Sequence, residues 1–354
     1  MTTQYRHFTL LIILFFSVFP LSANTPYITH VYDYRPAPGQ FVNIMPQIAG
    51  NPEKAAEEQI AGNNQGMVCL GGWGGYIVFG FDHPVVNVAG GYDLLIEGNA
   101  YYQTPDDPTK GSSEPGIVCV SQDINKNGIP DDPWYEIQGS EHNNTQTIDN
   151  YRITYYRTPA DHVAAPADKP LNFFTDTTYI YWQDNQGNEG YMPKNSFHKQ
   201  DYFPEWITDN ELTFTGTLLP PNGVDNAGKG INYTMTCYDY GYADAHPNTS
   251  DHAKINLEWA VGEDGMPANL THVDFFKVYT GVYQICGMIG EVSTEITGAQ
   301  DLHPDAVLPL SIEQTRLDDM PSPCKVFRNG MIFIRHGKAL YTPVGQYYNA
   351  IIND

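Results

Sequence analysis

Short oxygen-bearing side chains stand at alternate positions between residues 123 and 131, a spacing that suits a calcium ion. The candidate ligands are the side chains of Asp123, Asn125, Asn127 and Asp131 and the backbone carbonyl of Ile129. Calcium takes about six to eight oxygen ligands, and a loop that supplies one at every second position can wrap around the ion. A glycine at position 128 stands where such a loop must turn sharply. The sequence therefore predicts a calcium site.

The end of this loop departs from the usual calcium-binding pattern. Trp134 stands where an EF-hand loop has a bidentate glutamate, so the flanking helices of that motif are not predicted. Asp132 or Glu136 would complete the ligand set. The alternative is a turn rich in Asp and Asn without an ion, because these side chains also form hydrogen bonds with their own backbone.

Aromatic side chains beside turns are candidates for ligand binding. Trp73 lies in the glycine-rich segment 70–75, and Tyr101 and Tyr102 follow the end of an expected strand. If these side chains are exposed, their flat faces form a platform for a sugar or another planar ligand. The alternative is that the Trp73 indole covers the end of the hydrophobic core.

Signals for catalysis are weaker. Glu97, Glu114 and Asp82 could supply the carboxylate pair of a glycosidase, in which one acid protonates the leaving oxygen and the other attacks or activates water. The chain has 41 acidic residues, however, so chance provides such pairs freely. The local motifs of zinc proteases, serine hydrolases and phosphate-binding loops are missing. We therefore expect ligand binding, with a secreted hydrolase acting on glycans as the alternative.

Two further metal signals lie in one aromatic and histidine-containing region. His246 and His252 have a spacing that could suit a transition metal, although solvated loop histidines are the simpler interpretation. Asp239 and Asp244 could join a second calcium site.

The composition excludes several classes of partner. The net charge is −23, and it becomes −24 without residues 1–23, which carry one Arg and no acid. Such a surface repels nucleic acids and anionic membranes. No segment after the first 23 residues is apolar enough for a transmembrane helix. Five scattered cysteines are too few for a disulfide scaffold, so we interpret them as small buried residues, with one or two disulfides as the alternative.

The elements that must position these residues are mostly strands. With 32 Gly, 26 Pro and 25 Tyr, the chain combines frequent turns with many aromatic residues. Its apolar runs are short and bounded by turn residues, which predicts an all-β, jelly-roll-like antiparallel β-sandwich. The expected strands cover residues 76–81, 92–97, 117–120, 151–156, 178–182, 211–215, 233–240, 254–259 and 275–279. One helix is expected over 52–60, with Asn51 as its N-cap and Gly62 after its end.

The two ends of the chain have separate roles in this prediction. Arg6, an apolar run over 8–19 and small residues at 21–23 indicate a signal peptide over residues 1–23. The expected sandwich domain covers 24–303, with a long surface loop over 158–171. A linker over 304–323 then leads to a small β-hairpin unit, residues 324–354.

The tail also resembles a known kind of segment. Its sequence VFRNGMIFIRHGKALY (326–341), followed by Gly345 and Gln346, is similar to the end of type IX sorting segments of exported Bacteroidetes proteins. That resemblance implies secretion through the outer membrane and surface attachment. The alternative is a last hairpin of the fold.

The main body resembles a family of Bacteroidetes cell-surface proteins. The motifs that carry the resemblance are YRPAPGQFVN (34–43), LGGWGG (70–75), FDH (81–83), EGNA (97–100), SEPGI (113–117), WYEIQGS (134–140) and YGYAD (240–244). Membership implies a location on the outer-membrane exterior. Some related proteins accompany nutrient uptake through the outer membrane, including cobalamin capture. The resemblance therefore adds cobalamin to glycans as a candidate ligand and the uptake or secretion machinery as a candidate partner.

Overall fold

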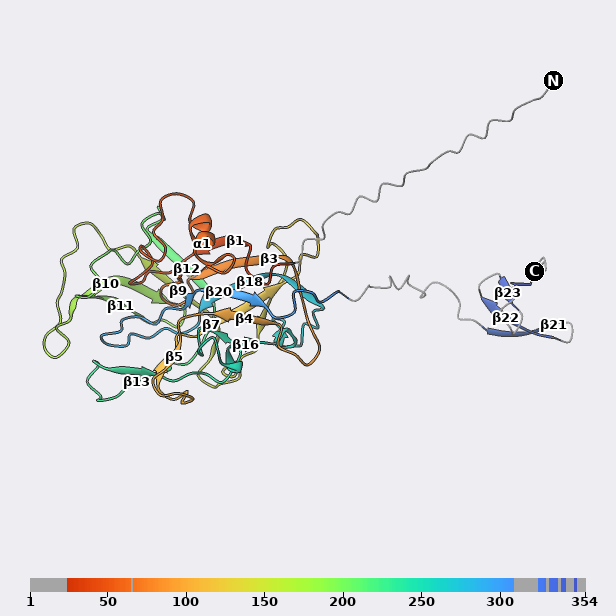
Figure 1. Cartoon of the computed structure of the whole chain (residues 1–354). Coiled ribbons are helices and arrows are strands. Elements are labelled where there is room, and N and C mark those ends of the chain that lie inside the picture. Colours follow the sequence, from red (N-terminus) through yellow and green to blue (C-terminus); the bar gives the residue numbers. More distant parts are fainter. Residues whose placement is uncertain are drawn as a thin grey trace, which may run out of the picture. The chain divides into compact units, whose positions relative to one another are not determined.

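A computed structural model of the chain describes residues 24–64, 66–308, 324–328, 331–336, 339–341 and 347–348. The chain divides into two units, residues 1–307 and residues 308–354 (Figure 1). The expected signal peptide, residues 1–23, lies outside the described residues, as does the expected linker from residue 309 onward. None of the described helices is long and apolar enough to cross a membrane.

Antiparallel sheets build most of the first unit, which confirms the predicted all-β class. The largest sheet contains, in order, β1 (His30–Arg35), β3 (Tyr76–Val86), β18 (His272–Thr280), β7 (Gly116–Ser121), β8 (Trp134–Ile137) and β17 (Ala260–Val261), with β15 (Tyr242–Ala243) paired to β7. The second sheet contains, in order, β11 (Glu189–Asn195), β10 (Phe174–Asp184), β9 (Ile148–Tyr156) and β12 (Glu211–Leu218). We call the second one the β9–β12 sheet. The jelly-roll connectivity stays a prediction.

Three smaller sheets complete this unit. The first contains β13 (Gly223–Asp225), β14 (Tyr233–Met235), β6 (Gly111–Ser112) and β5 (Tyr101–Tyr102). The second contains β16 (Lys254–Ile255), β4 (Leu94–Glu97) and β20 (Gly298–Asp301), and the third contains β19 (Glu295–Ile296) and β2 (Val68–Cys69).

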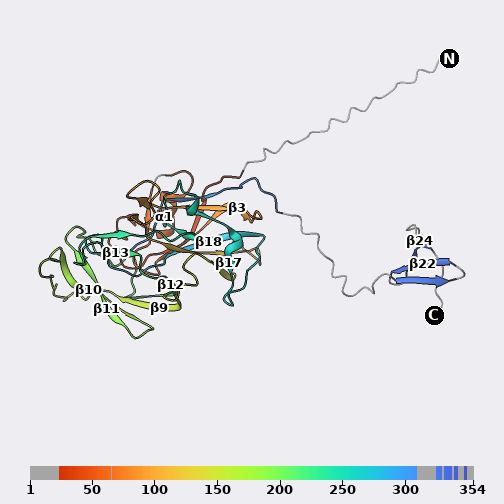
Figure 2. The same ribbon diagram turned by 90° about the horizontal axis from the view of Figure 1, so that it is seen from below.

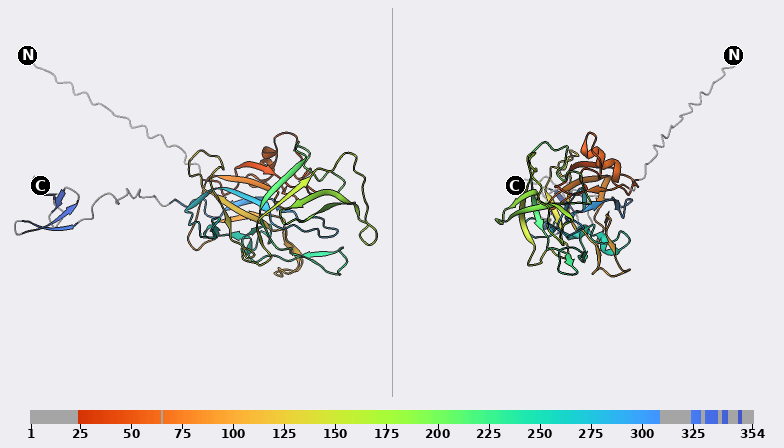
Figure 3. Two further views of the ribbon diagram at one scale, coloured as in Figure 1. Left: turned by 180° about the vertical axis from the view of Figure 1, so that it is seen from behind. Right: turned by 90° about the vertical axis from the view of Figure 1, so that its left-hand side faces the viewer.

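Two hydrophobic clusters hold these layers together. The first includes Phe79 and Phe276 of the largest sheet and Ile60 of the helix. The second joins the largest sheet to the β9–β12 sheet, through residues such as Tyr279 on β18 and Tyr155 on β9. Each fully buried side chain of this size contributes about 1.5–3 kcal/mol to folding. Figures 2 and 3 show the β9–β12 sheet at an outer side of the unit, with no helix or other sheet over its outward face.

The predicted helix is confirmed as α1 (Pro52–Ile60). The side chain of Asn51 accepts a hydrogen bond from the Lys54 N–H at 2.6 Å, as an N-cap does. Ile60 is fully buried in the first cluster. Gly62 follows the end of the helix with a φ of +66°.

Two predicted strands are shorter than expected. The expected strand 233–240 is limited to β14, after which Tyr238 turns inward and its hydroxyl donates to the Pro220 carbonyl. The expected strand 254–259 contains only β16, followed by a 3₁₀ helix, Leu257–Trp259. The side chain of Asn256 starts this helix by accepting a hydrogen bond from the Glu258 N–H at 2.7 Å. Another 3₁₀ helix, Asp251–Ala253, precedes β16.

The cysteines of the first unit are free thiols. Cys69 and Cys286 are buried, whereas Cys119 and Cys237 are partly buried. These four therefore form no disulfide, and the interpretation as small buried residues fits them.

The second unit contains more strands than the predicted hairpin. Its sheet has the order β21 (Cys324–Arg328), β22 (Met331–His336), β23 (Ala339–Tyr341) and β24 (Tyr347–Tyr348). All its strand pairs are antiparallel.

Deletion of residues 308–354 should leave the first unit cooperatively folded, because neither hydrophobic cluster includes a described residue of the second unit. We expect one sharp urea transition with the midpoint of the full chain, measured by circular dichroism and tyrosine fluorescence. An insoluble or molten product would show instead that the tail belongs to the core.

Candidate functional site

Strand alternation gives the β9–β12 sheet one buried face and one open face. In β9, Ile153 and Tyr155 are buried in the second cluster, so the side chains of Thr154 and Tyr156 face outward. In β12, Leu212 is buried in the same way, and the residues on either side of it are exposed. The open face is the first candidate site.

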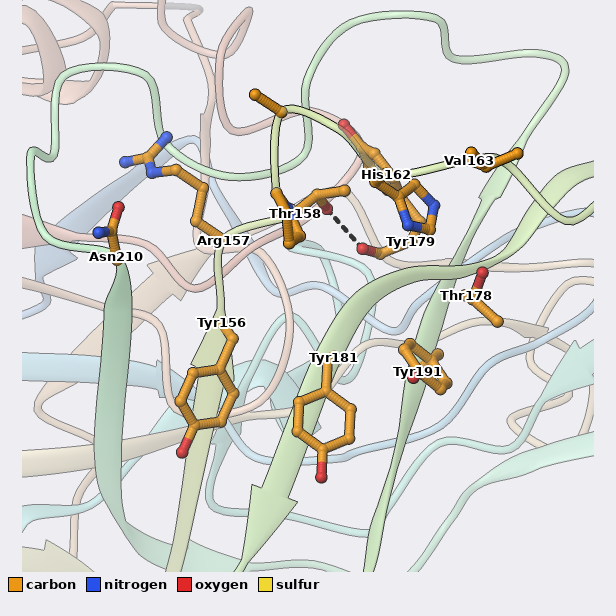
Figure 4. Close-up of a pocket in the computed structure, with 12 residues that line it drawn as sticks. Tyr156, Arg157, Thr158, His162, Val163, Thr178, Tyr179, Tyr181, Tyr191 and Asn210 are labelled. Carbon is orange, nitrogen blue, oxygen red and sulfur yellow. Dashed lines mark hydrogen bonds between the residues drawn. The ribbon is translucent and has the colours of Figure 1, made fainter.

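Three tyrosines form a row across this open face, and we call Tyr156, Tyr181 and Tyr191 the tyrosine platform. In the strand register Tyr181 pairs with Tyr156 on β9 and with Tyr191 on β11. Ring centroids are 5.5 Å apart for Tyr156 and Tyr181, and 5.3 Å apart for Tyr181 and Tyr191. The planes of the first pair differ by only 31°, and both rings turn a face to the viewer in Figure 4.

Polar side chains of the next row hold these rings in place. The hydroxyl of Tyr181 donates to Glu189 at 2.5 Å and accepts from the Gln183 amide at 2.7 Å. The hydroxyl of Tyr156 donates to Gln183 at 3.3 Å. The hydrogen bond between Tyr181 and Glu189 raises the pKa of the phenol and lowers the pKa of the carboxyl group. Because these two hydroxyls reach along the sheet to the next row, the rings of Tyr156 and Tyr181 lie over the sheet with their faces outward, whereas the Tyr191 ring is tilted by 51° from that of Tyr181.

A tight turn fixes β10 against β11 and therefore Tyr181 against Tyr191. The Asp184 carboxylate accepts hydrogen bonds from the N–H groups of Gln186 and Asn188 at 2.9 and 2.7 Å. Gly187 has a φ of +83°, which this turn requires.

The segment between β9 and β10 forms a wall beside the tyrosine platform. Thr158 donates to the Tyr179 carbonyl at 2.5 Å (Figure 4). His162 bonds the Asp176 carboxylate at 2.6 Å. Burial alone would raise the pKa of Asp176, but its hydrogen bonds outweigh burial and lower it. Wall and platform border a hollow of about 1020 Å³. Its lining residues are Tyr156, Arg157, Thr158, Pro159, Ala160, His162, Val163, Thr178, Tyr179, Tyr181, Tyr191 and Asn210.

The three platform tyrosines were not among the predicted ligand-binding residues. A local signal exists, since Tyr156 and Tyr181 stand at outward positions of alternating strands that were correctly predicted. The row itself depends on the register between three strands, which the local pattern does not contain.

Trp73 is not part of a binding platform, and this prediction was wrong. Its side chain is fully buried and meets the ring of Tyr151 edge-on, with centroids 4.8 Å apart. Gly71 and Gly74 have φ values of +71° and +87°, and a Cβ on Gly71 would come within 2.0 Å of a carbonyl oxygen. The glycines therefore let segment 70–75 turn into the core.

Tyr101 and Tyr102 lie on β5, in a different sheet from the tyrosine platform. Tyr101 is 59% exposed, so it remains available to a ligand. The hydroxyl of Tyr102 lies 2.6 Å from Nδ1 of His246, whose Nε2 bonds the Tyr238 carbonyl. Both ring nitrogens of His246 are engaged, so the predicted pairing with His252 on a transition metal is not favoured.

The predicted calcium loop joins β7 to β8, and its candidate side chains converge. The amide nitrogen of Asn125 lies 3.1 Å from the Asp131 carboxylate, and that of Asn127 lies 3.1 and 3.3 Å from its two oxygens. Asp123 accepts hydrogen bonds from the N–H groups of Asn127 and Gly128 at 3.0 and 2.8 Å. The candidate side chains therefore lie close together. The Asn125 and Asn127 amide oxygens accept hydrogen bonds from the N–H groups of Asn127 and Ile129, as in the alternative of a turn rich in Asp and Asn, so the calcium site stays a prediction.

Of the two residues predicted to complete the calcium shell, only Asp132 lies in the loop. Its carboxylate accepts a hydrogen bond from the Ile124 N–H at 3.1 Å. Glu136 instead lies on β8 and accepts hydrogen bonds from Thr217 at 2.8 Å and Tyr279 at 3.3 Å.

An acidic cavity of about 230 Å³, bordered by the exposed residues Asn99 and Ile289, is the second candidate site. Glu114, Asp244 and Glu295 each bring a carboxylate oxygen within 4.8 Å of the others. Only 9% of Glu114 and 5% of Glu295 is exposed. The lining residues are Gln40, Phe41, Met45, Met67, Asn99, Glu114, Ile289, Glu291, Ser293 and Glu295. Glu291, Ser293 and Glu295 stand at alternate positions, so their side chains can face the same cavity. This local pattern could have indicated the cavity, but it was not among the predicted sites.

Hydrogen bonds compensate part of this buried charge. Asp244 accepts from the N–H groups of Asn99 and Ala100 at 2.8 Å each and of Glu295 at 3.0 Å. Glu114 accepts from the Ser293 N–H at 3.0 Å. The Asp244 carboxylate thereby links the backbone at residues 99–100 to the backbone at Glu295.

Burial controls the protonation of the cavity. It raises the pKa of Glu114 to about 7 and the pKa of Glu291 to about 7. Burial and the nearby Glu114 also raise the pKa of Glu295 and of Asp244. Carboxyl groups that exchange protons near neutral pH suit general acid–base chemistry.

The other predicted acidic residues do not join this cavity. Glu97 accepts a hydrogen bond from a glutamine of β20 at 2.8 Å, and Asp82 pairs with the adjacent histidine at 2.6 Å. Neither forms the predicted carboxylate pair with Glu114. Asp239 is exposed and pairs with a histidine, whereas Asp244 is buried, so these two do not form the predicted second calcium site.

No model of a known protein family matches the chain, and no curated protein is significantly similar to it.

The stability of the protein should fall as the pH rises from about 4.5 to about 7. In that range the folded state binds more protons than the unfolded state, because burial raises the pKa of Glu291 from 4.5 to about 7. One such group contributes about 3 kcal/mol across this range, at about 1.4 kcal/mol per pKa unit. Urea unfolding at pH 5 and pH 8 measures the difference.

The matched variants are Glu291→Gln and, at an exposed position, Glu263→Gln. The first should reduce the loss of stability between pH 5 and pH 8, and the second should leave it unchanged. An equal pH dependence in wild type and Glu291→Gln would contradict the raised pKa.

Proposed function

We propose that this protein binds a glycan on the tyrosine platform. The observation that carries the proposal is the row of three neighbouring tyrosine rings on a sheet face without a covering layer. Flat aromatic faces suit the apolar C–H faces of sugar rings, and a polar tip beside each ring suits the hydroxyl groups.

The residues around the platform support a polar ligand. Thr154 and Thr213 share a hydrogen bond of 2.8 Å on the same face, one row from the rings. Gln183 and Glu189 stand in that row as well, in register with Thr154 on the neighbouring strands. Together they offer hydroxyl, amide and carboxylate groups within reach of a ligand that lies on the rings.

The proposal includes export and a location at the cell surface. The apolar run over 8–19 supports a signal peptide, and the resemblance to Bacteroidetes surface proteins supports a place on the outer-membrane exterior. In that setting the ligand would be a nutrient, and the outer-membrane uptake machinery would be the partner. The tail, residues 324–354, would serve as the sorting segment.

Calcium is the proposed cofactor, held by the loop between β7 and β8. Asp123, Asn125, Asn127, Asp131 and the Ile129 carbonyl would be its ligands. This loop joins two strands of the largest sheet, so the role of the ion would be to stabilise that sheet.

A hydrolase acting on glycans is the second candidate, and the acidic cavity favours it. Glu114 and Glu291, with pKa values of about 7, resemble the general acid that a glycosidase needs. The cavity measures about 230 Å³, whereas the hollow at the platform measures about 1020 Å³. Pockets for small-molecule ligands usually measure about 300–1000 Å³. Binding on the platform is therefore the better-supported function.

Calcium should raise the melting temperature, because an ion that binds only the folded loop shifts the folding equilibrium by mass action. Excess chelator should lower it, and Asp123→Ala should abolish both responses. Asp106→Ala, at an exposed acidic position outside the loop, is the control. A melting temperature that stays unchanged in excess chelator, with the metal-free state verified by elemental analysis, would rule out the calcium site.

Tyr181→Ala should weaken glycan binding by about 1–3 kcal/mol, as loss of a central aromatic contact does. The expected cost in stability is small, because the ring lies on the open face of the sheet. Tyr92→Ala is the control, since Tyr92 is an exposed tyrosine outside the β9–β12 sheet. Binding is measured by calorimetry against a glycan panel, with release of reducing ends followed in parallel.

The same screen includes cobalamin, a planar nutrient that could also cover several rings. If cobalamin binds and no glycan does, the proposed ligand is wrong and cobalamin takes its place. Release of reducing ends that disappears in Glu114→Gln would favour the hydrolase instead.

A further inference from the structure

Building on the proposed function, we infer that the glycan is a neutral, unbranched chain that lies across the strands and covers at least three sugar units. Three features of the open face carry this inference: the row of side chains, the wall beside it and the charges at its rim.

The row runs from one edge of the β9–β12 sheet to the other. Glu211 on β12 pairs with Tyr156 on β9, Tyr156 pairs with Tyr181 on β10, and Tyr181 pairs with Tyr191 on β11. β11 and β12 are the two outer strands of the sheet. A chain on this row can therefore continue past both edges, and the direction across the strands is the one along which the rings repeat.

The spacing of the rings sets the number of units. Adjacent centroids are 5.5 and 5.3 Å apart, a separation comparable to the length of one pyranose unit. Each tyrosine can then contact one sugar ring, with Tyr181 at the central unit. Two sugars would leave one of the three contacts unmade.

The sides of the row leave room for a single chain. His162 and Val163 form part of the wall on one side, where the hollow is bordered by the segment between β9 and β10 (Figure 4). Gln183 and Glu189 stand on the other side and bond the hydroxyl of Tyr181. A branch toward the wall would meet the segment, so an unbranched chain fits best.

The charges at the rim favour a neutral chain. Glu211 is exposed at one end of the row, and Glu189 lies beside Tyr181 and Tyr191. Two such carboxylates repel uronate groups on a bound chain. Arg157 also lines the hollow, but its guanidinium donates to the carbonyls of Ile207 and Asp209 and lies over the Phe203 ring.

Two other cations lie near this row. Lys194 donates to the hydroxyl of Tyr179, a lining residue of the hollow, at 3.2 Å, and the carboxylates of Asp176 and Asp201 lie close enough to interact with its charge. Arg152 is exposed and pairs in register with Thr215. It stands four residues from Tyr156 along β9, about 13 Å at a strand rise of about 3.3 Å per residue. At that distance, beyond the Debye length of physiological salt, its charge is largely screened and does not offset the carboxylates at the row.

The test is calorimetric titration of the full chain with hexasaccharides. The neutral probes are cellohexaose, xylohexaose and mannohexaose, and the anionic probe is hexagalacturonate. We expect at least one neutral probe to bind at least tenfold more tightly than hexagalacturonate. Its disaccharide should bind at least tenfold more weakly than its tetrasaccharide. Added salt should reduce the preference for the neutral probe, because salt screens charge repulsion.

Variants separate charge from shape. Glu211→Gln should reduce the ratio of affinities for the neutral probe and hexagalacturonate at least threefold, without weakening the binding of the neutral probe. Glu263→Gln should leave this ratio unchanged. Equal or tighter binding of hexagalacturonate, abolished by Tyr181→Ala, would overturn the neutral chain but leave glycan binding intact. Equal affinity for the disaccharide and the tetrasaccharide would overturn the three-unit row. Failure of every glycan to bind would overturn the proposed function and this inference with it.

Discussion

Packing between the largest sheet and the β9–β12 sheet is the constraint on which the tyrosine platform depends. Because successive side chains of a strand alternate between faces, the burial of one set determines the exposure of the other. Tyr155 and Tyr156 show this most directly. Tyr155 is fully buried and its hydroxyl donates to the Trp73 carbonyl at 3.1 Å, whereas Tyr156 faces outward and bonds Gln183. A register shift of one residue would exchange their roles and remove the platform.

The glycine-rich segment 70–75 links this core to the acidic cavity. At one end, Trp73 fills the space between the two sheets. At the other, the N–H of Gly71 donates to the hydroxyl of Ser293 at 3.1 Å, and that hydroxyl donates to Glu295 at 3.0 Å. Packing of the sandwich and the position of a cavity carboxylate therefore depend on the same turn, which only residues without a Cβ can form.

Local patterns predicted the elements better than they predicted the sites. The Asn51 cap and the alternation in 151–156 depend on residues close in sequence, and both were predicted correctly. The loop predicted to bind calcium is also local, and its candidate side chains lie close together. The tyrosine platform and the acidic cavity combine residues from strands distant in sequence, so their geometry depends on pairing that no single segment encodes. Trp73 was misplaced because a glycine-rich turn has the same sequence whether it faces solvent or the core.

The two candidate sites differ in the free-energy cost that a ligand meets on binding. The platform rings have few rotatable bonds, and hydrogen bonds to Gln183 and Glu189 restrict Tyr156 and Tyr181 further, so these two side chains have little conformational freedom to lose on binding. In the acidic cavity, burial raises the pKa of Glu114, Glu291 and Glu295, so these carboxyl groups keep their protons to a higher pH than exposed ones do. A ligand there must work against desolvation in a small space. The tyrosine platform suits a molecule whose flat units have the same spacing as the tyrosine rings, and a glycan chain is such a molecule.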